Sequence, residues 1–113
     1  FVRHSRYTFQ FMEKEESYSL CFFEEEYREA LKKLGTLSGR DTDKLSGTGL
    51  HEAFENGVPY FEEASLVLIC RKVYSNDLAP GHFLDASIHN NYPDHDYHRA
   101  YIGNIVKVLE KVK

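Results

Sequence analysis

The sequence has too few cysteines for a disulfide framework. Its 113 residues include only Cys21 and Cys70, and each lies in an apolar stretch of the kind that forms strands. Free, buried thiols in a reducing compartment explain this usage better than a single bridge does. We therefore expect a cytoplasmic protein whose fold does not depend on disulfides.

Long apolar runs and an excess of positive charge are also missing. No stretch approaches the ~20 apolar residues of a membrane span, and none resembles a signal peptide. The 14 Lys and Arg residues are scattered, and the formal net charge is −4. A nucleic-acid binder normally shows a basic face, and a membrane-surface protein a basic cluster. Neither nucleic acid nor membrane is therefore expected as a partner.

Several catalytic motifs are absent as well. The sequence contains no Gly-rich nucleotide loop of the Rossmann or P-loop type, no Gly-x-Ser-x-Gly elbow and no credible cysteine nucleophile. It begins Phe-Val-Arg without an initiator methionine, which we interpret as a sign that a segment precedes it. A cofactor would have to be recognised by other residues.

The residues that are present can build one domain over residues 1–113. The chain is 42% hydrophobic and 14% aromatic, which is enough for a core at this length. Periodicity predicts helices over about residues 6–15, 24–34 and 81–90, a helical turn over 41–45, and strands over 17–23, 50–55, 58–74 and 101–109. About four strands with inserted helices suggest a small open or split barrel, because closure usually requires six to eight strands.

Local signals fix several boundaries of these elements. Ser5 is a candidate N-cap for the first helix, and Gly35 a candidate left-handed cap after the second. Asn56-Gly57 is the strongest short-range signal for a β-hairpin. Pro59 soon after it indicates an edge strand or late pairing.

Two basic segments have the chemistry that a phosphate requires. In the first, Arg3 and Arg6 flank Ser5 at an expected helix N-terminus, and Thr8 adds a hydroxyl. In the second, Ser38, Gly39 and Arg40 lead to Lys44 in a polar loop. A capped helix with solvated arginines explains the first segment equally simply. A connecting loop whose two aspartates neutralise its cations explains the second.

A histidine-rich stretch near the C-terminus is the third candidate. It contains His82, His89, Asp94, His95, Asp96 and His98. The spacing matches no compact set of metal ligands, so we predict no metal site. One functional histidine in a solvated loop is the simpler interpretation, and His98 at the entrance of the last strand is the preferred candidate.

Taken in order, these segments resemble the flavoredoxin-like branch of the flavin reductase family. The resemblance rests on Arg-x-Ser-Arg-Tyr-Thr, Ser-Tyr-Ser-Leu-Cys-Phe-Phe, Ser-Gly-Arg-Asp-Thr-Asp-Lys and the Asp96–Gly103 segment, and it covers essentially the whole chain. It implies a Greek-key, FMN-binding split β-barrel, of which this chain would be the C-terminal portion. It also implies a homodimer with the flavin near the interface, and a possible redox partner protein.

The resemblance assigns roles to individual residues. Contacts to the flavin phosphate and ribityl chain would come from Arg3, Ser5, Arg6, Tyr7 and Thr8, with Ser38, Gly39 and Lys44 approaching from a second side. His98 would lie near the ring face where a nicotinamide stacks, as the catalytic residue.

The expected reaction is hydride transfer from NAD(P)H to flavin, with the redox chemistry supplied by the cofactor. Two alternatives remain open. One is an electron-transfer flavoprotein that holds FMN without this reaction. The other is a truncated, dimerising domain that binds no cofactor.

Overall fold

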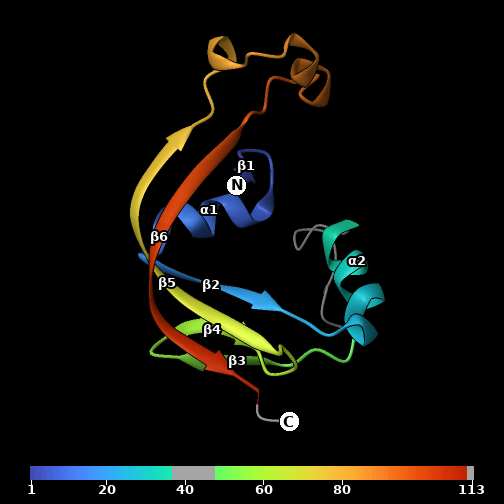
Figure 1. The fold of residues 1–113 in the computed structure, drawn as a ribbon, viewed down its shortest axis with the longest axis vertical. Helices are drawn as coiled ribbons and strands as arrows, with labels where there is room; N and C mark the ends of the chain where they lie inside the picture. The colour runs from blue at the N-terminus through green and yellow to red at the C-terminus, as the bar shows by residue number, and fades with distance from the viewer. Residues whose placement is uncertain (37–47, 112–113) are drawn as a thin grey trace.

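In the described part of the chain, two antiparallel sheets are surrounded by short helices (Figure 1). The computed structural model describes residues 1–36 and 48–111. The larger sheet has the order β1-β6-β5-β2, and β3 pairs with β4 in the smaller one. The strands are β1 (Val2–Arg3), β2 (Ser17–Phe22), β3 (Glu52–Glu55), β4 (Val58–Phe61), β5 (Leu66–Asp77) and β6 (His98–Glu110). The helices are α1 (Tyr7–Lys14) and α2 (Arg28–Thr36), with 3₁₀ turns η1 (Glu25–Tyr27), η2 (Pro80–His82) and η3 (Ala86–Asn91).

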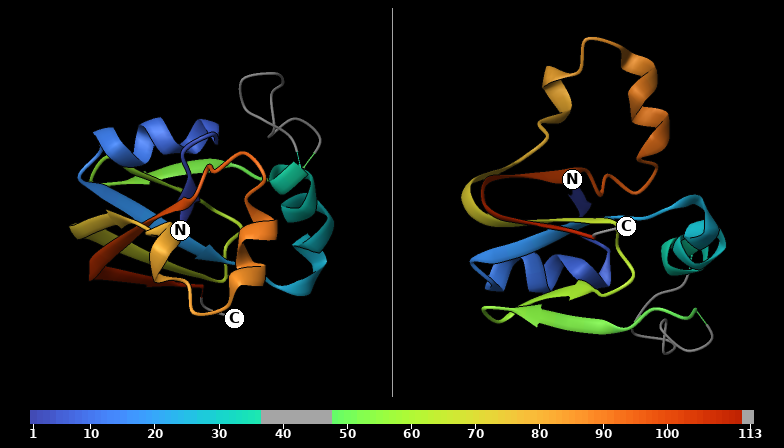
Figure 2. Two further views of the ribbon diagram at one scale, coloured as in Figure 1. Left: turned by 90° about the horizontal axis from the view of Figure 1, so that it is seen from above. Right: turned by 60° about the horizontal axis from the view of Figure 1, so that its bottom comes forward.

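The two longest strands, β5 and β6, form an antiparallel pair that curves through the molecule (Figure 1). Its register runs from Leu66 opposite Glu110 to Asp77 opposite Arg99, with irregularities after Ile69 and after Lys72. Such irregularities bend and twist a strand pair. The excursion of residues 78–97 joins the two strands and stands away from the rest of the chain in two views (Figures 1 and 2).

The predicted hairpin at Asn56-Gly57 is confirmed. Asn56 and Gly57 have φ values of 48° and 81°, the two positive values that a type I′ turn requires. Pro59 lies opposite Phe54 in this two-stranded sheet. The strand predicted over 58–74 is interrupted, however, since β4 ends at Phe61 and β5 begins at Leu66 in the other sheet.

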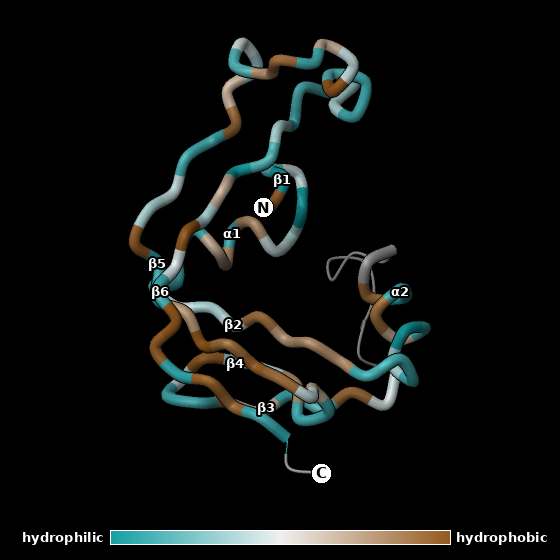
Figure 3. The backbone as a smooth tube through the Cα atoms, in the orientation of Figure 1, coloured by the Kyte–Doolittle hydropathy of each residue, from teal (hydrophilic) through white to brown (hydrophobic). Residues whose placement is uncertain are grey.

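The core lies between the hairpin β3–β4 and one face of the larger sheet. Ser19 on β2 donates a hydrogen bond of 2.6 Å to the carbonyl of Pro59, which joins the two layers. The buried centre consists of Val58, Ala64, Val67 and Ile69, with Cys21, Phe23, Tyr60 and Leu109 packed against it. Figure 3 shows apolar residues along β2, β5 and β6 where these strands lie near the hairpin.

Gly103 on β6 allows a close approach by Tyr18 from β2. A Cβ atom at position 103 would lie 2.5 Å from the hydroxyl oxygen of Tyr18, which is closer than Cβ atoms come to other atoms in real structures. Burial raises the pKa of Tyr18, and the neighbouring Cys70 thiol raises it further. Cys70 is buried and Cys21 half-buried, and both are free thiols.

The helices differ from the predictions at their ends. Helix α1 begins at Tyr7, and its N-cap is Arg6 in an extended conformation, so the prediction of Ser5 as N-cap is wrong. Gly35 lies inside α2, which ends at Thr36, so its predicted role as a cap is wrong too. The helix predicted over 81–90 is replaced by η2 and η3. No helix among the described residues has the length and apolar character to cross a membrane.

Candidate functional site

A surface cleft of about 350 Å³ brings together residues from the two ends of the sequence. Its lining consists of Phe1, Val2, Arg3, Arg6, Thr8 and His98. The pairing of β1 with β6 places Arg3 directly opposite His98, and the chain then turns into α1. Four residues predicted from the sequence, Arg3, Arg6, Thr8 and His98, therefore meet in one place.

Arg3 lies at the rim of this cleft and is held by the excursion between β5 and β6. Its Nη1 atom donates to Oδ1 of Asp96 at 3.0 Å, and its Nη2 atom donates to the carbonyl of Asn91 at 2.8 Å. Its guanidinium lies 4.5 Å from the centre of the Tyr92 ring. Arg3 thus fastens the excursion to the start of the chain, and Asp96 balances its charge.

Ser5 joins the same carboxylate. Its hydroxyl donates to Oδ2 of Asp96 at 2.7 Å, so it does not cap α1. This hydrogen bond, followed by the charge of Arg3, holds the pKa of Asp96 below its usual range. Ser5 belongs to the support of the cleft and is absent from its lining.

Arg6 and Thr8 lie at the N-terminal end of α1, on the wall of the cleft. The side chain of Arg6, the N-cap residue, makes no capping hydrogen bond to the first turn. The N-terminus of a helix carries partial positive charge and attracts anions. Tyr7 lies between them in sequence but packs edge-on against Phe11, with ring centres 5.2 Å apart. An Arg side chain, a hydroxyl and the helix end thus form one electropositive wall.

His98 forms the opposite wall, at the first residue of β6. Its Nδ1 atom lies 2.5 Å from the hydroxyl oxygen of Tyr92. Burial lowers the pKa of His98, and the positive charge of Arg3 lowers it further, against the opposing effect of Asp96. Both effects favour the neutral imidazole.

Aromatic rings support this wall from behind. Tyr92 and Tyr97 are buried, with ring centres 4.5 Å apart, and Phe83 stacks on Tyr97 at 5.9 Å. His89 completes the cluster, since its Nδ1 atom lies 2.8 Å from the Tyr97 hydroxyl. The excursion therefore has a small core of its own directly beside the cleft.

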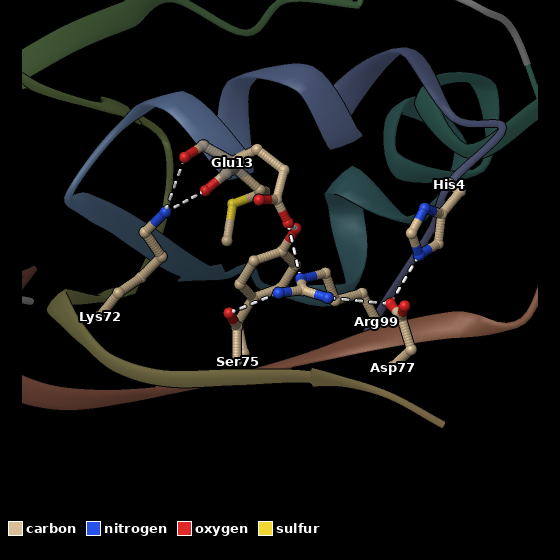
Figure 4. A network of polar contacts seen from close by, with 8 residues as sticks. His4, Glu13, Lys72, Ser75, Asp77 and Arg99 are labelled. Atoms are coloured by element: carbon tan, nitrogen blue, oxygen red, sulfur yellow. Dashed lines mark hydrogen bonds and ion pairs between the residues drawn. The ribbon is translucent and has the colours of Figure 1, made fainter. Parts of the chain in front are cut away.

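A polar network anchors α1 and the start of the chain to β5 and β6 (Figure 4). Arg99 lies at its centre, with Nε 2.7 Å from the Glu13 carboxylate and Nη1 3.1 Å from Asp77. His4 contacts Asp77 at 2.6 Å, and the Tyr101 hydroxyl donates to Glu13 at 2.7 Å. Burial, followed by this bond to Glu13, raises the pKa of Tyr101 to about 12.

Lys72 adds a second anchor at the other end of α1. Its ammonium donates to the carbonyl of Met12 and, at 3.4 Å, to that of Glu13. The last carbonyls of a helix lack partners within the helix and carry partial negative charge, so a lysine there is stabilising. Together the two anchors fix the direction in which α1 presents its N-terminus to the cleft.

The second basic segment belongs to the part of the chain that the structure does not describe. Ser38, Gly39 and Lys44 lie outside the described residues. His51, Glu62 and Glu63 bring potential metal ligands within 4.8 Å of one another, away from the histidine-rich excursion. Two hydrogen bonds from His51 to Glu63, at 2.6 and 3.0 Å, explain this group as the closure of the β3–β4 hairpin.

A larger hollow of about 580 Å³ lies between α1 and the β3–β4 hairpin. Among the described residues of its lining, Lys14 is the one cation, and Glu15 and Glu16 follow it directly in the sequence. An anionic ligand would meet net negative charge there. The smaller cleft, with Arg6, Thr8 and His98, is the better candidate for a phosphate-bearing molecule.

Sequence reasoning missed the residues that support the cleft. Nothing in the sequence marked Tyr92 or Asn91 as site residues, and Asp96 entered only with the histidine-rich stretch and the Asp96–Gly103 segment. Asp96 was visible as part of the histidine-rich stretch, yet its partners lie about 90 residues away along the chain. No local pattern could have paired them.

Comparison with known proteins identifies the fold. The family model described as flavin reductase like domain matches residues 1–112. An FMN-binding protein from Thermus thermophilus with bound p-hydroxybenzaldehyde has a TM-score of 0.72 at 19% identity, covering 97% of this chain and 52% of that one. Flavoredoxin from Methanosarcina acetivorans has a TM-score of 0.73 at 21% identity, covering 97% and 50%. No curated protein matches the chain.

These likenesses confirm the predicted fold class, a mainly β split barrel with short inserted helices. The chain spans about half the length of these solved structures. Within the described part of the chain the two sheets do not close on each other, as expected for an incomplete barrel.

Proposed function

This chain belongs to the flavin reductase like domain family, and from that premise we propose that it binds FMN at the cleft and serves a flavin-dependent redox function. One observation carries the proposal. The cleft joins Arg6 and Thr8, at the N-terminus of α1, to His98 at the start of β6. These residues come from opposite ends of the sequence, and they offer charge, hydroxyl and imidazole to one ligand.

The residues of the cleft suit the phosphate end of FMN. Arg6 can form a fork of hydrogen bonds to phosphate oxygens, and the helix N-terminus attracts negative charge. Thr8 adds a hydroxyl donor. Arg3 and Ser5 act mainly through Asp96, which fixes the edge of the site. Arg6 and Thr8 line the cleft beside the N-terminus of α1, and we propose that they contact the phosphate directly.

We propose that the reaction is hydride transfer from NAD(P)H. A bound flavin supplies the redox chemistry, and the protein supplies orientation and electrostatics. His98 orients the nicotinamide from the wall of the cleft. Its neutral state avoids repulsion with the positive charge that a nicotinamide gains on oxidation.

A second function is favoured by one likeness. A solved structure with this fold is named flavoredoxin, a name that indicates electron transfer. The chain would then hold FMN and exchange electrons with a protein partner, without accepting hydride from a nicotinamide.

Absorbance spectroscopy tests both functions. The protein purified after expression with added FMN should show the visible bands of bound flavin. Adding NADH or NADPH under anaerobic conditions should bleach these bands if the chain accepts hydride. Bleaching by dithionite alone would favour the electron-transfer function. A colourless protein that binds no added FMN would contradict both, and would favour a domain without a cofactor.

We also propose that two copies associate, with the flavin near their interface. The larger sheet exposes apolar side chains that a partner copy could cover, among them Leu20, Phe22 and Val108. Burial of such surface stabilises association. Sedimentation velocity with and without FMN should show a dimer that FMN strengthens, and a monomer at all concentrations would contradict it. The cytoplasmic location expected from the two free cysteines stays a prediction.

A further inference from the structure

We infer that Tyr92 is a positioning residue, which donates its hydroxyl proton to Nδ1 of His98 and so leaves an Nε2–H donor for the ligand in the cleft. The significance of this arrangement for a redox reaction rests on the proposed function. The arrangement itself concerns only side chains of this chain, and it can be measured without flavin.

The direction of the hydrogen bond follows from burial. Tyr92 is 7% exposed, and its hydroxyl oxygen lies 2.5 Å from Nδ1 of His98. Within the described residues, the hydroxyl has no other hydrogen-bond partner. If Nδ1 carried the proton, the hydroxyl would accept it and its own hydrogen would have no acceptor among the described residues. That state costs free energy, so the hydroxyl donates.

The charges around His98 favour the same state. Arg3, on β1, lies opposite it and disfavours a second positive charge, and burial acts in the same direction. Asp96, in the excursion, opposes this effect, but its carboxylate is already bonded to Arg3 and Ser5. With one proton on the ring and Nδ1 used as acceptor, that proton lies on Nε2.

Tyr92 is well held for this task. The Arg3 guanidinium lies 4.5 Å from the centre of its ring, and Tyr97 packs against it with ring centres 4.5 Å apart. The same Arg3 bonds to the carbonyl of Asn91, the preceding residue. Ring and backbone are both fixed, so the hydroxyl keeps its direction toward His98.

The consequence concerns the ligand chemistry. Arg6, Thr8 and the Nε2–H of His98 all offer donors to the cleft. The cleft is therefore suited to acceptor oxygens, such as those of phosphate and of a carboxamide or other carbonyl group. His98 acts there as a neutral hydrogen-bond donor, and proton abstraction by its Nε2 atom is excluded in this tautomer.

The excursion supplies a matched control. Tyr97 belongs to the same aromatic cluster, is also buried, and pairs through its hydroxyl with Nδ1 of His89 at 2.8 Å. Tyr97→Phe removes one hydroxyl from the cluster without touching His98. Tyr92→Phe removes the hydroxyl that bonds to His98.

Long-range ¹H–¹⁵N correlation spectra of the imidazole rings, on the full chain without flavin near pH 7.5, test the inference. We expect His98 to carry its proton on Nε2, with an Nδ1 resonance typical of a hydrogen-bonded acceptor. In Tyr92→Phe that resonance should shift to the position of an unbonded nitrogen. In Tyr97→Phe the His89 signals should change and those of His98 should not.

Two results would overturn the inference. One is a proton on Nδ1 of His98, or a doubly protonated ring, in the unmodified chain, a measurement that does not depend on any variant folding. The other is an unchanged His98 Nδ1 resonance in Tyr92→Phe. Failure of the chain to bind FMN in a separate titration would refute the proposed function and leave the hydrogen bond as measured.

Discussion

Arg6 is the residue on which recognition of the phosphate most depends. It lines the cleft at the N-terminus of α1, two residues before Thr8, which lines the same wall. Arg6→Ala should weaken FMN binding by ~1–3 kcal/mol, the range for a hydrogen bond to a charged group. Quenching of flavin fluorescence on titration measures the affinity.

The matched control for Arg6 is Arg28→Ala. Arg28 is an exposed helical arginine, paired with Glu25 at 3.3 Å and outside the cleft lining. It should leave FMN affinity unchanged. Equal affinities for the Arg6 and Arg28 variants would show that Arg6 has no part in binding.

His98 gives the protein a pH-dependent stability. Its pKa is lower in the folded state, so the unfolded chain binds more protons once the pH falls below the ordinary imidazole value of about 6.5. The contribution of His98 to the free energy of unfolding is thus fully present above the ordinary imidazole pKa, and it is lost as the pH falls through the lower pKa of the folded state. Asp77 and Asp96, whose pKa values are also lowered, act only at more acid pH.

Urea unfolding between about pH 7.5 and 5 measures this effect. The free energy of unfolding should decrease as the pH is lowered. His98→Gln should flatten this dependence of the free energy on pH. His51 is the opposite case, because its hydrogen bond to Glu63 raises its pKa. His51→Gln should therefore steepen the fall slightly. A slope that His98→Gln leaves unaltered would refute a lowered pKa for His98.

The individual residues also show where sequence reasoning ends. That Arg6 and Thr8 lie at a helix start and His98 at a strand entrance could be predicted, because these are local features. The actual partners of Arg3 and Ser5 could not, because both bond to Asp96, 93 and 91 residues away. An arginine beside a serine predicts an affinity for anions, and here the nearest anion is a side chain of the protein itself.

At the scale of elements, the turn between β3 and β4 depends on Gly57. Its φ of +81° lies in the left-handed region, which side chains disfavour, while nothing lies within 4 Å of a Cβ built there. Gly57→Ala should therefore cost about 1 kcal/mol through backbone strain alone. Thermal unfolding monitored by circular dichroism measures the loss.

Gly81→Ala is the control for this substitution. Gly81 also has open space around it, but its φ is not positive. The variant should unfold within error of the unmodified chain. A Gly57→Ala variant as stable as Gly81→Ala would mean that the turn is not the type described.

The position of α1 depends on Arg99. This side chain contacts Glu13 on α1 and Asp77 on β5, and it donates to Ser75 at 3.0 Å. Arg99→Met keeps much of the packing and removes the charge. Amide hydrogen exchange in residues 7–14 should become roughly tenfold faster, since local opening is easier once an anchor is lost.

The same measurement separates an anchor from a surface charge. Arg28→Met, in exposed α2, should leave exchange in α1 unaltered. Unchanged exchange in Arg99→Met would show that Lys72 alone holds the helix.

Most elements could be predicted from periodicity, and the errors have physical causes. Alternation in residues 17–23 and the Asn56-Gly57 dipeptide are local signals, and both elements are present. A helix predicted over 81–90 would place Phe83, Leu84 and Ile88 on its inward face. Phe83 instead stacks on Tyr92 and Tyr97, and this tertiary cluster leaves only short 3₁₀ turns.

On the scale of the whole molecule, strand count and motif order predicted the fold class. The strands predicted over 58–74 and 101–109 are in fact β5 (Leu66–Asp77) and β6 (His98–Glu110). Their pair carries the cleft at one end and the hydrophobic core at the other. How β1 pairs beside β6 could not be predicted, because β1 has only two residues. Yet this pairing sets Arg3 opposite His98 and so builds the cleft.

The central claim is that FMN binds at the cleft of Arg6, Thr8 and His98. An FMN titration followed by ¹H–¹⁵N amide correlation spectra tests it most directly, because it locates the ligand as well as detecting it. The account predicts saturable shifts concentrated at residues 2–8 and 96–99, with residues 51–63 of the hairpin region unaffected. The absence of shifts, or shifts confined to the hairpin region, would contradict it.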